Sequence, residues 1–299
     1  MGYRHGLDTL TLLALRNLLA LPCFLVGVCW SEIRCRQKSG DRSASGRPVV
    51  LRAGDFVRIA GLGFVGYYLS SLVNFFGLQH ISVGLERMIL YTYPSLVMLG
   101  SALFLHKPLR RKAVLAMLVA YLGLALGFAA EIHVGPQGNL VLGASLVFCS
   151  AVTYAIFTAC SGQWVRRFGP VRLMSWVLLA SSIMVLIHFS LSHSWQIFGQ
   201  LSPQAWSLGL ALAGLGTVLP SYLFGWGLHR AGASATAVIG MVGPPGTLVL
   251  AWWLLGEPIT AWQVLGLSLT MAGGLAMSLQ KTSPQGLTDE KRASEGSEI

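Results

Sequence analysis

Residues 85–108, LERMILYTYPSLVMLGSALFLHKP, form a long apolar run that opens on a charged pair and ends at a proline. The same spacing returns 150 positions later, without a gap, in residues 235–258, ATAVIGMVGPPGTLVLAWWLLGEP. Pairs in this register are Pro94 and Pro244, Leu105 and Leu255, Pro108 and Pro258, Gly123 and Gly273, Ser71 and Ser221. A fixed internal period marks a repeated architecture, so the chain is predicted to have two related halves.

The composition indicates a membrane protein. Of 299 residues, 54% are hydrophobic and 11% are charged, and the mean hydropathy is +0.64, whereas soluble domains carry about 25% charged residues. The net charge of +10 comes from Lys and Arg in short loops, so a nucleic-acid partner is not expected. The five cysteines lack metal-site or disulfide spacing, and neither a metal nor another cofactor is expected.

Nine apolar runs have the length of about 20 residues that an α-helix needs to cross a bilayer. They cover residues 9–30, 55–78, 84–105, 111–130, 139–161, 172–191, 204–228, 233–255 and 261–280. The predicted fold class is therefore all-α, a polytopic membrane helix bundle with nine transmembrane helices. Residues 281–299 are polar and are expected to form a disordered tail.

The loops predict the orientation of the chain. Lys and Arg gather in loops 31–54, 106–112 and 162–172, whereas loops 131–138, 192–203 and 256–260 have none. Because cytoplasmic loops carry the excess of Lys and Arg, the first group and the C-terminus are predicted to be cytoplasmic.

Two inverted repeats follow from this count. Runs 84–105 and 233–255 are the third and the eighth, so they cross the membrane in opposite directions. The first repeat is predicted at residues 1–130 and the second at 139–280. The first has four runs and the second has five, so we expect that one N-terminal helix is absent from this chain.

Arg16 is the most conspicuous candidate for function. It lies inside the first apolar run, where a charge costs about 2.5–3.5 kcal/mol on insertion scales. One interpretation is an anion-binding or counter-ion site in a cavity. The alternative is a structural pair with Glu86, or a side chain that snorkels to the membrane surface.

Further polar and aromatic side chains share helix faces in the predicted spans, as expected of a cavity wall. The complete set of predicted substrate-pathway residues is Arg16, Tyr67, Ser71, Asn74, Glu86, Arg87, Tyr91, Pro94, Tyr154, Ser221, Tyr222, Trp226 and Pro244. Helix packing with serines as polar contacts, and static kinks at the prolines, are the structural alternatives. No Asp or Glu is expected to be deeply buried, so exchange, uniport and proton coupling all stay open.

The chain resembles the drug/metabolite transporter superfamily, and within it the EamA-type branch. The carrying residues are Arg16, residues 77–94 (GLQHISVGLERMILYTYP) and residues 254–274 (LLGEPITAWQVLGLSLTMAGG). The resemblance implies two inverted five-helix repeats, so this chain would lack the first of ten helices. At residues 106–107 the first repeat has His-Lys where the second has the family-like Gly-Glu.

The resemblance implies a multi-pass carrier of the inner membrane rather than an enzyme. Its expected activity is efflux or exchange of a small metabolite, amino acid or drug-like solute by alternating access. A non-transporting or degenerate membrane subunit is one alternative, and a carrier of nucleotide sugars or phosphates is another. The expected partners are the lipid bilayer and a small solute, and a homodimer is left open.

Overall fold

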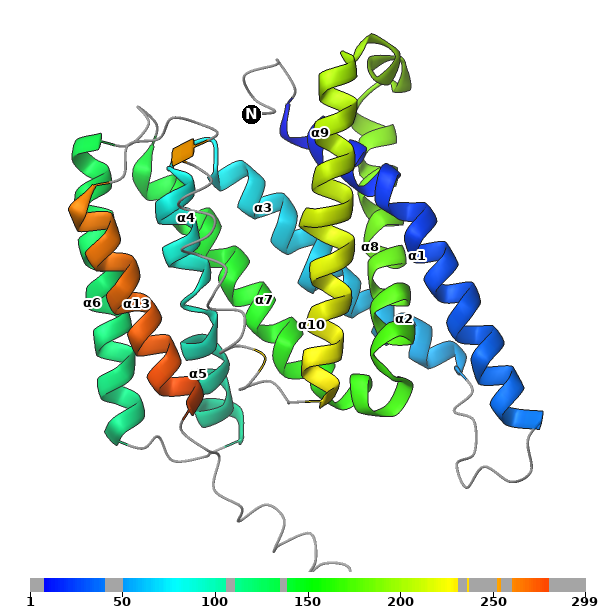
Figure 1. Ribbon diagram of the computed structural model, residues 1–299, viewed down its shortest axis with the longest axis horizontal. Coiled ribbons are helices and arrows are strands. Elements are labelled where there is room, and N and C mark those ends of the chain that lie inside the picture. Colours follow the sequence, from blue (N-terminus) through cyan, green and yellow to red (C-terminus); the bar gives the residue numbers. More distant parts are fainter. Residues whose placement is uncertain are drawn as a thin grey trace, which may run out of the picture.

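The protein is helical throughout the part of the chain that the computed structural model describes, residues 8–40, 51–105, 111–134, 139–230, 236, 252–253 and 260–279 (Figure 1). The elements are α1 (Thr9–Gly40), α2 (Ala53–Gly63), η2 (Phe64–Leu69), α3 (Ser70–Gly77), α4 (Val83–Leu90), α5 (Tyr93–Leu105), α6 (Arg111–Val134), α7 (Leu140–Phe168), α8 (Pro170–Ser192), η3 (Trp195–Gln200), α9 (Pro203–Ala213), η4 (Gly214–Val218), α10 (Leu219–Arg230) and α13 (Ala261–Leu279). Pro244, most of the run 233–255 and the tail 281–299 lie outside the described residues.

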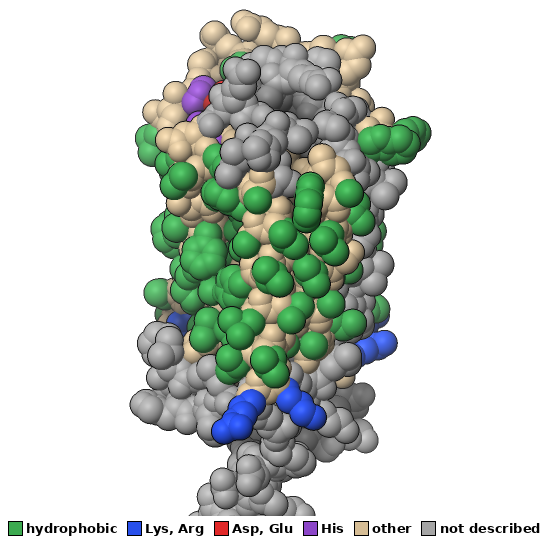
Figure 2. All heavy atoms as spheres, turned by 90° about the vertical axis from the view of Figure 1, so that its left-hand side faces the viewer, with side chains coloured by type: hydrophobic (Ala, Val, Ile, Leu, Met, Phe, Trp, Pro, Cys, Tyr) green, Lys and Arg blue, Asp and Glu red, His purple; other side chains and the backbone are tan. Residues whose placement is uncertain are grey.

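Six helices among the described residues are long and apolar enough to cross a membrane. They are Thr9–Cys35, Ala53–Gly77, Arg111–Ala129, Leu140–Phe168, Pro170–Ser192 and Pro203–Arg230. Their outward faces are apolar, and Figure 2 shows a broad belt of hydrophobic side chains on one side of the molecule, with Lys and Arg below it. The chain is therefore a multi-pass membrane protein, since so much exposed apolar surface requires lipid.

Short polar signals set where several helices begin. The side chains of Ser82, Asn139 and Ser202 each accept a hydrogen bond from the backbone three residues later and cap α4, α7 and α9. At the turn between α7 and α8, Gly169 adopts a φ of 81°, and Pro170 follows in the first turn of α8.

Helix α1 is longer than its apolar run, so the predicted end near residue 30 is wrong. It continues to Gly40 through a polar stretch. Within that stretch Glu32 forms a two-pronged ion pair with Arg172 of α8, at 2.7 and 2.8 Å, and accepts a hydrogen bond from the Trp176 indole. Paired polar groups hold this extension against α8, whereas the apolar pattern marks only its membrane part.

The run 84–105 is two helices and not one. Helix α4 ends at Leu90, and α5 begins at Tyr93. Pro94 in the first turn of α5 has no N–H for the Leu90 carbonyl, so an uninterrupted helix would lose a hydrogen bond there. The Thr92 hydroxyl donates to the Ile89 carbonyl at 2.7 Å, and the Ser95 hydroxyl donates to the Thr92 carbonyl at 2.6 Å.

Two of the long helices share a local irregularity. A π-helical turn interrupts Ala53–Gly77 at Phe64–Leu69, and another interrupts Pro203–Arg230 at Gly214–Val218. The first residues of the two helices are 150 positions apart, and so are the first residues of the two π turns. The two helices run in opposite directions through the molecule (Figure 1).

Helices α6 and α13 pack closely against each other and antiparallel (Figure 1). A Cβ at Gly123 would collide with the backbone of Gly266, and a Cβ at Gly273 would collide with the backbone of Ala116. The Thr270 hydroxyl reaches the Ala120 carbonyl, 3.3 Å away on the other helix. The two glycine contacts are equivalent under the 150-residue shift, because each joins position 123 of one half to position 116 of the other.

Candidate functional site

A cavity of about 1390 Å³ lies among α1, α3, α4, α7 and α10, with walls that also include both π turns. Most of the lining is apolar or aromatic, and a few polar side chains interrupt it. Small-molecule sites have this character, with an apolar wall and a small number of placed polar groups. The volume exceeds the common range of about 300–1,000 Å³, so the space admits a solute together with water.

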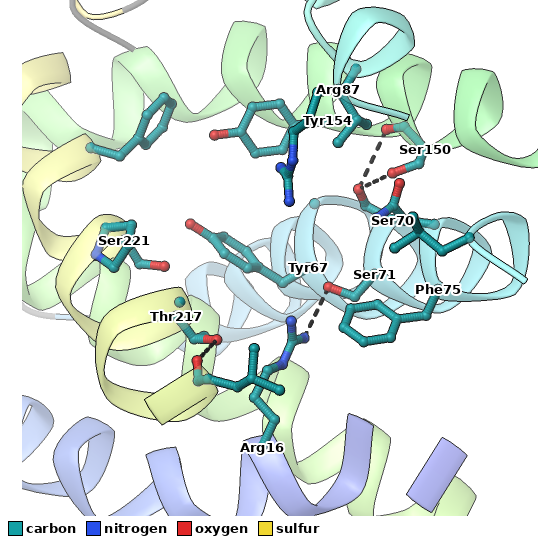
Figure 3. Close-up of a pocket in the computed structure, with 18 of the residues that line it drawn as sticks. Arg16, Tyr67, Ser70, Ser71, Phe75, Arg87, Ser150, Tyr154, Thr217 and Ser221 are labelled. Atoms are coloured by element: carbon teal, nitrogen blue, oxygen red, sulfur yellow. Dashed lines mark hydrogen bonds between the residues drawn. The ribbon is translucent and has the colours of Figure 1, made fainter. Parts of the chain in front are cut away.

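Arg16 enters the cavity from α1 (Figure 3). One of its terminal nitrogens donates a hydrogen bond of 3.1 Å to the Ser71 hydroxyl. The guanidinium carbon lies 5.1 Å from the centre of the Phe75 ring, within cation–π range. Among the described residues the buried Nε finds no hydrogen-bond partner, and no carboxylate lies within ion-pair distance.

Glu86 and Arg87 form the second charged feature. Glu86 is fully buried, which corrects the expectation that no acidic side chain is deeply buried. Its Oε2 lies 3.1 Å from Nε of Arg87, an ion-pair distance without hydrogen-bond geometry. Its Oε1 accepts a 3.0 Å hydrogen bond from the Asn74 amide. The proposed pairing of Arg16 with Glu86 is not found, because Glu86 is already occupied by these two neighbours.

The Asn74 side chain is left with a free acceptor. A carboxylate only accepts hydrogen bonds, so the amide nitrogen of Asn74 must face Glu86. The amide oxygen Oδ1 then points elsewhere, and it is buried without a partner among the described residues. Asn74 lies on α3 one turn after Ser71, so Asn74 and Arg16, which bonds to Ser71, border the same stretch of cavity wall.

Aromatic rings form the opposite wall. Tyr93 and Tyr154 meet edge to face with centroids 5.4 Å apart, and Phe224 lies 5.9 Å from Tyr154. Figure 3 shows the Tyr67 hydroxyl directed toward Ser221, so side chains from the two helices that carry π turns face each other across the cavity. In the view of Figure 3 the Tyr67 side chain lies between Arg16 and Arg87, both of which direct their guanidinium groups into the cavity.

Eight of the predicted pathway residues line this cavity, namely Arg16, Tyr67, Ser71, Asn74, Arg87, Tyr91, Tyr154 and Ser221. Glu86 is not a lining residue, but it pairs with Arg87, which lines the cavity. The other predictions fall elsewhere: Pro94 shapes the break between α4 and α5, the Tyr222 hydroxyl is 2.8 Å from that of Ser175, and Trp226 is exposed beside Arg230. Pro94 lies away from the cavity because of the helix break, and Tyr222 and Trp226 lie on other faces of α10 than Ser221, which lines the cavity.

The lining residues that sequence reasoning missed include Phe75, Tyr93 and Ser150. Ser150 could have been found, since it lies four residues before Tyr154 on the same face of α7. Phe75 has the same spacing from Ser71, but an aromatic side chain in an apolar span, such as Phe75 or Tyr93, is more often a packing residue. Their roles become visible only when the helices are placed together.

The fold and the cavity together define a polytopic helical membrane protein with a cavity large enough to hold a small solute. The EamA-like transporter family matches residues 2–128 and 141–279, and the chain belongs to that family. The class is therefore that of a membrane transporter of the drug/metabolite transporter superfamily.

Three similar proteins illustrate the relationship. An uncharacterized transporter of Bacillus subtilis (strain 168), YcbK, is 29% identical over 265 residues, which cover 86% of this chain and 79% of the relative. The uncharacterized transporter sll1319 of Synechocystis sp. (strain ATCC 27184 / PCC 6803 / Kazusa) is 29% identical over 282 residues, 91% of this chain and 80% of the relative. One crystal structure superposes with a TM-score of 0.63 at 16% identity, over 92% of this chain and 90% of the other, and shares the fold.

Proposed function

We propose that the protein carries a small solute across the inner membrane by alternating access, as a secondary transporter. The observation that supports this most directly is the cavity, whose two charged groups come from the first half of the chain and whose aromatic wall comes from both halves. The solute would be a small metabolite, an amino acid or a drug-like molecule, moved by efflux or exchange.

We further propose that residues 1–130 and 139–280 are inverted repeats that rock against each other around the cavity. The antiparallel α6–α13 contact and the π turns at matching positions support this arrangement. Transporters of this kind bind solute at the repeat interface, often at interrupted helices. The break between α4 and α5 supplies such an interruption, and Tyr91 at the break lines the cavity.

Solute counterflow in proteoliposomes tests the transport proposal, because it does not require the substrate to be identified first. Vesicles with purified protein are loaded with a small-molecule cell extract and placed in isotopically labelled extract. Mass spectrometry then reports which labelled species enter. Exchange of at least one species above protein-free vesicles is expected.

Blocking the cavity gives the specific control. Gly216 lines the cavity and an added Cβ would meet only Leu212, 3.8 Å away, so Gly216→Trp places a large ring in the open space. Gly61 is exposed on α2 with nothing near its Cβ position, so Gly61→Trp adds the same ring outside. Gly216→Trp should abolish exchange and Gly61→Trp should retain it. Equal exchange in the two variants would refute transport through this cavity.

A further inference from the structure

The charge of the cavity points to the charge of its ligand. Resting on the transport function proposed above, we infer that the solute is a small organic monoanion that also carries a hydrogen-bond donor, such as an aromatic hydroxycarboxylate. Arg16 binds the anionic group, Asn74 accepts from the donor, and the tyrosines hold the body of the molecule.

The cavity has one net positive charge among the described side chains. Arg87 is neutralised by Glu86, whereas Arg16 has no carboxylate partner in the described part of the chain. The other described acidic side chains with printed ion pairs are engaged outside the cavity lining: Glu32 with Arg172, Asp55 with Arg167, and Asp8 with His193. A monoanion therefore completes the charge balance, and a dianion would have to displace Glu86 from Arg87.

Arg16 is held in a manner that leaves room for an anion. A buried cation loses its hydration, and this loss is unfavourable unless a negative group compensates for it. The Ser71 hydroxyl and the Phe75 ring fix the guanidinium in position but supply little compensating charge. The unpartnered Nε offers a donor, and a carboxylate matches the planar fork of a guanidinium with two parallel hydrogen bonds.

Asn74 supplies the second point of recognition. Its Oδ1 is a buried acceptor without a partner among the described residues, and a buried polar group without a hydrogen bond is unfavourable. A hydroxyl group on the ligand would satisfy it without changing the charge of the monoanion. Because the Asn74 amide nitrogen donates to Glu86, the side chain cannot turn to donate to an acceptor on the ligand instead.

The size and wall of the cavity set the rest of the ligand. Tyr67, Tyr91, Tyr93 and Tyr154 surround the space with rings, and Phe224 extends this wall. Such rings favour a flat apolar or aromatic body. An inorganic anion would satisfy Arg16 but would leave this wall without a contact.

A matched ligand series tests the inference in purified full-length protein. Mandelate, mandelamide and 2-amino-1-phenylethanol share a phenyl ring and a hydroxyl donor but are anionic, neutral and cationic, and phenylacetate keeps the anion without the hydroxyl. Naphthyl analogues of all four extend the body. Binding is measured by ligand-induced thermal stabilisation and by tryptophan fluorescence titration. A hydroxy-carboxylate should bind at least about tenfold more tightly than its amide, its amine and the acid without a hydroxyl.

Three variants locate the effect. Arg16→Gln should lose at least about tenfold in hydroxy-carboxylate affinity, and Arg16→Lys should keep the preference for the anion. Arg58→Gln removes an exposed cation that lies beside Trp164 outside the cavity, and it should bind as the unmodified protein does. Thermal unfolding without ligand shows whether each variant is folded.

The outcomes separate this inference from the transport proposal. Preferential binding of the amide or amine, unchanged affinity in Arg16→Gln, or counterflow of neutral or cationic species alone would overturn the inference and leave transport intact. The inference would also be overturned if none of the test ligands bound and if counterflow were seen only for anions that lack an aromatic body or a hydrogen-bond donor. Absence of counterflow for every species would refute transport itself, and the inference with it.

Discussion

At the scale of single residues, Glu86 decides what the cavity offers to a solute. It is fully buried, and it occupies both Arg87 and the Asn74 amide. Without this carboxylate the cavity would hold two free cations, and a phosphate group would be a natural ligand. With it, one guanidinium remains available, which makes a carrier of nucleotide sugars or phosphates a poorer fit than a carrier of monoanions.

Glu86→Gln should therefore destabilise the protein, because Arg87 loses its counter-charge. We expect a loss of about 1–3 kcal/mol, less than the 3–5 kcal/mol of a completely buried pair, since the Arg87 side chain stays 36% exposed. Denaturant unfolding in detergent measures the loss. The double variant Glu86→Gln, Arg87→Met should recover part of it, and a double variant no more stable than the single one would contradict the coupling.

At the scale of elements, the apolar pattern predicted where helices lie better than how they end. The runs at 55–78, 111–130 and 172–191 match helices of the structure closely. Pro94 correctly indicated an irregularity, but the break falls at Tyr91 and Thr92, where neighbouring hydroxyls satisfy the backbone. Helix α1 extends beyond its apolar run because the ion pair between Glu32 and Arg172 holds its polar end against α8. Such a pair leaves no periodic signal in the sequence.

The cavity wall was predicted from regular helical spacing, and this method also explains why the prediction was incomplete. Helical spacing placed Tyr67, Ser71 and Asn74 on one face, and the structure keeps them on the wall. The π turn after Gly63 rotates the next part of the helix about its axis, and nothing in the residues around it announces such a turn. Contacts between helices, such as Arg16 with Ser71, join positions 55 residues apart and have no local signature.

The α6–α13 contact yields a prediction about packing. Gly123→Leu and Gly273→Leu each push a side chain into the backbone of the facing helix, so each should cost at least about 1–3 kcal/mol. The two losses should be similar, since the contacts are equivalent under the 150-residue shift. Thermal unfolding in nanodiscs measures them.

Gly61→Leu is the control for this pair of variants, because the Cβ of residue 61 would meet nothing within 4 Å. It should unfold as the unmodified protein does. If Gly123→Leu and Gly273→Leu were also neutral, the close approach of α6 and α13 would be refuted.

At the scale of the whole molecule, charge and hydrophobicity divide the protein along one axis. The hydrophobic belt in Figure 2 separates an end with Lys and Arg from an end where His is seen. Such a division orients helices in a membrane, with the basic end in the cytoplasm. The proposed orientation thus depends on the Lys and Arg residues of the loops, whereas the proposed site depends on side chains in the middle of the helix bundle.

Cysteine labelling tests the orientation. In a background with all five native cysteines replaced by serine, Gly54→Cys lies at the basic end and Gly199→Cys in η3 at the other, and both positions have open space around them. A membrane-impermeant maleimide should label residue 199 in intact cells or spheroplasts and residue 54 only after permeabilisation. The reverse pattern would place the C-terminus outside.

The paired π turns bear on the history of the molecule. A π turn holds one more residue than the α-helical turn that it replaces, and such turns are rare. Both halves carry one that begins at the same offset, at residues 64 and 214. If the halves descend from one ancestral segment, the extra residue entered that ancestor before the gene duplicated. The irregularity is then older than the two-halved protein, and it has survived while most of the surrounding side chains diverged.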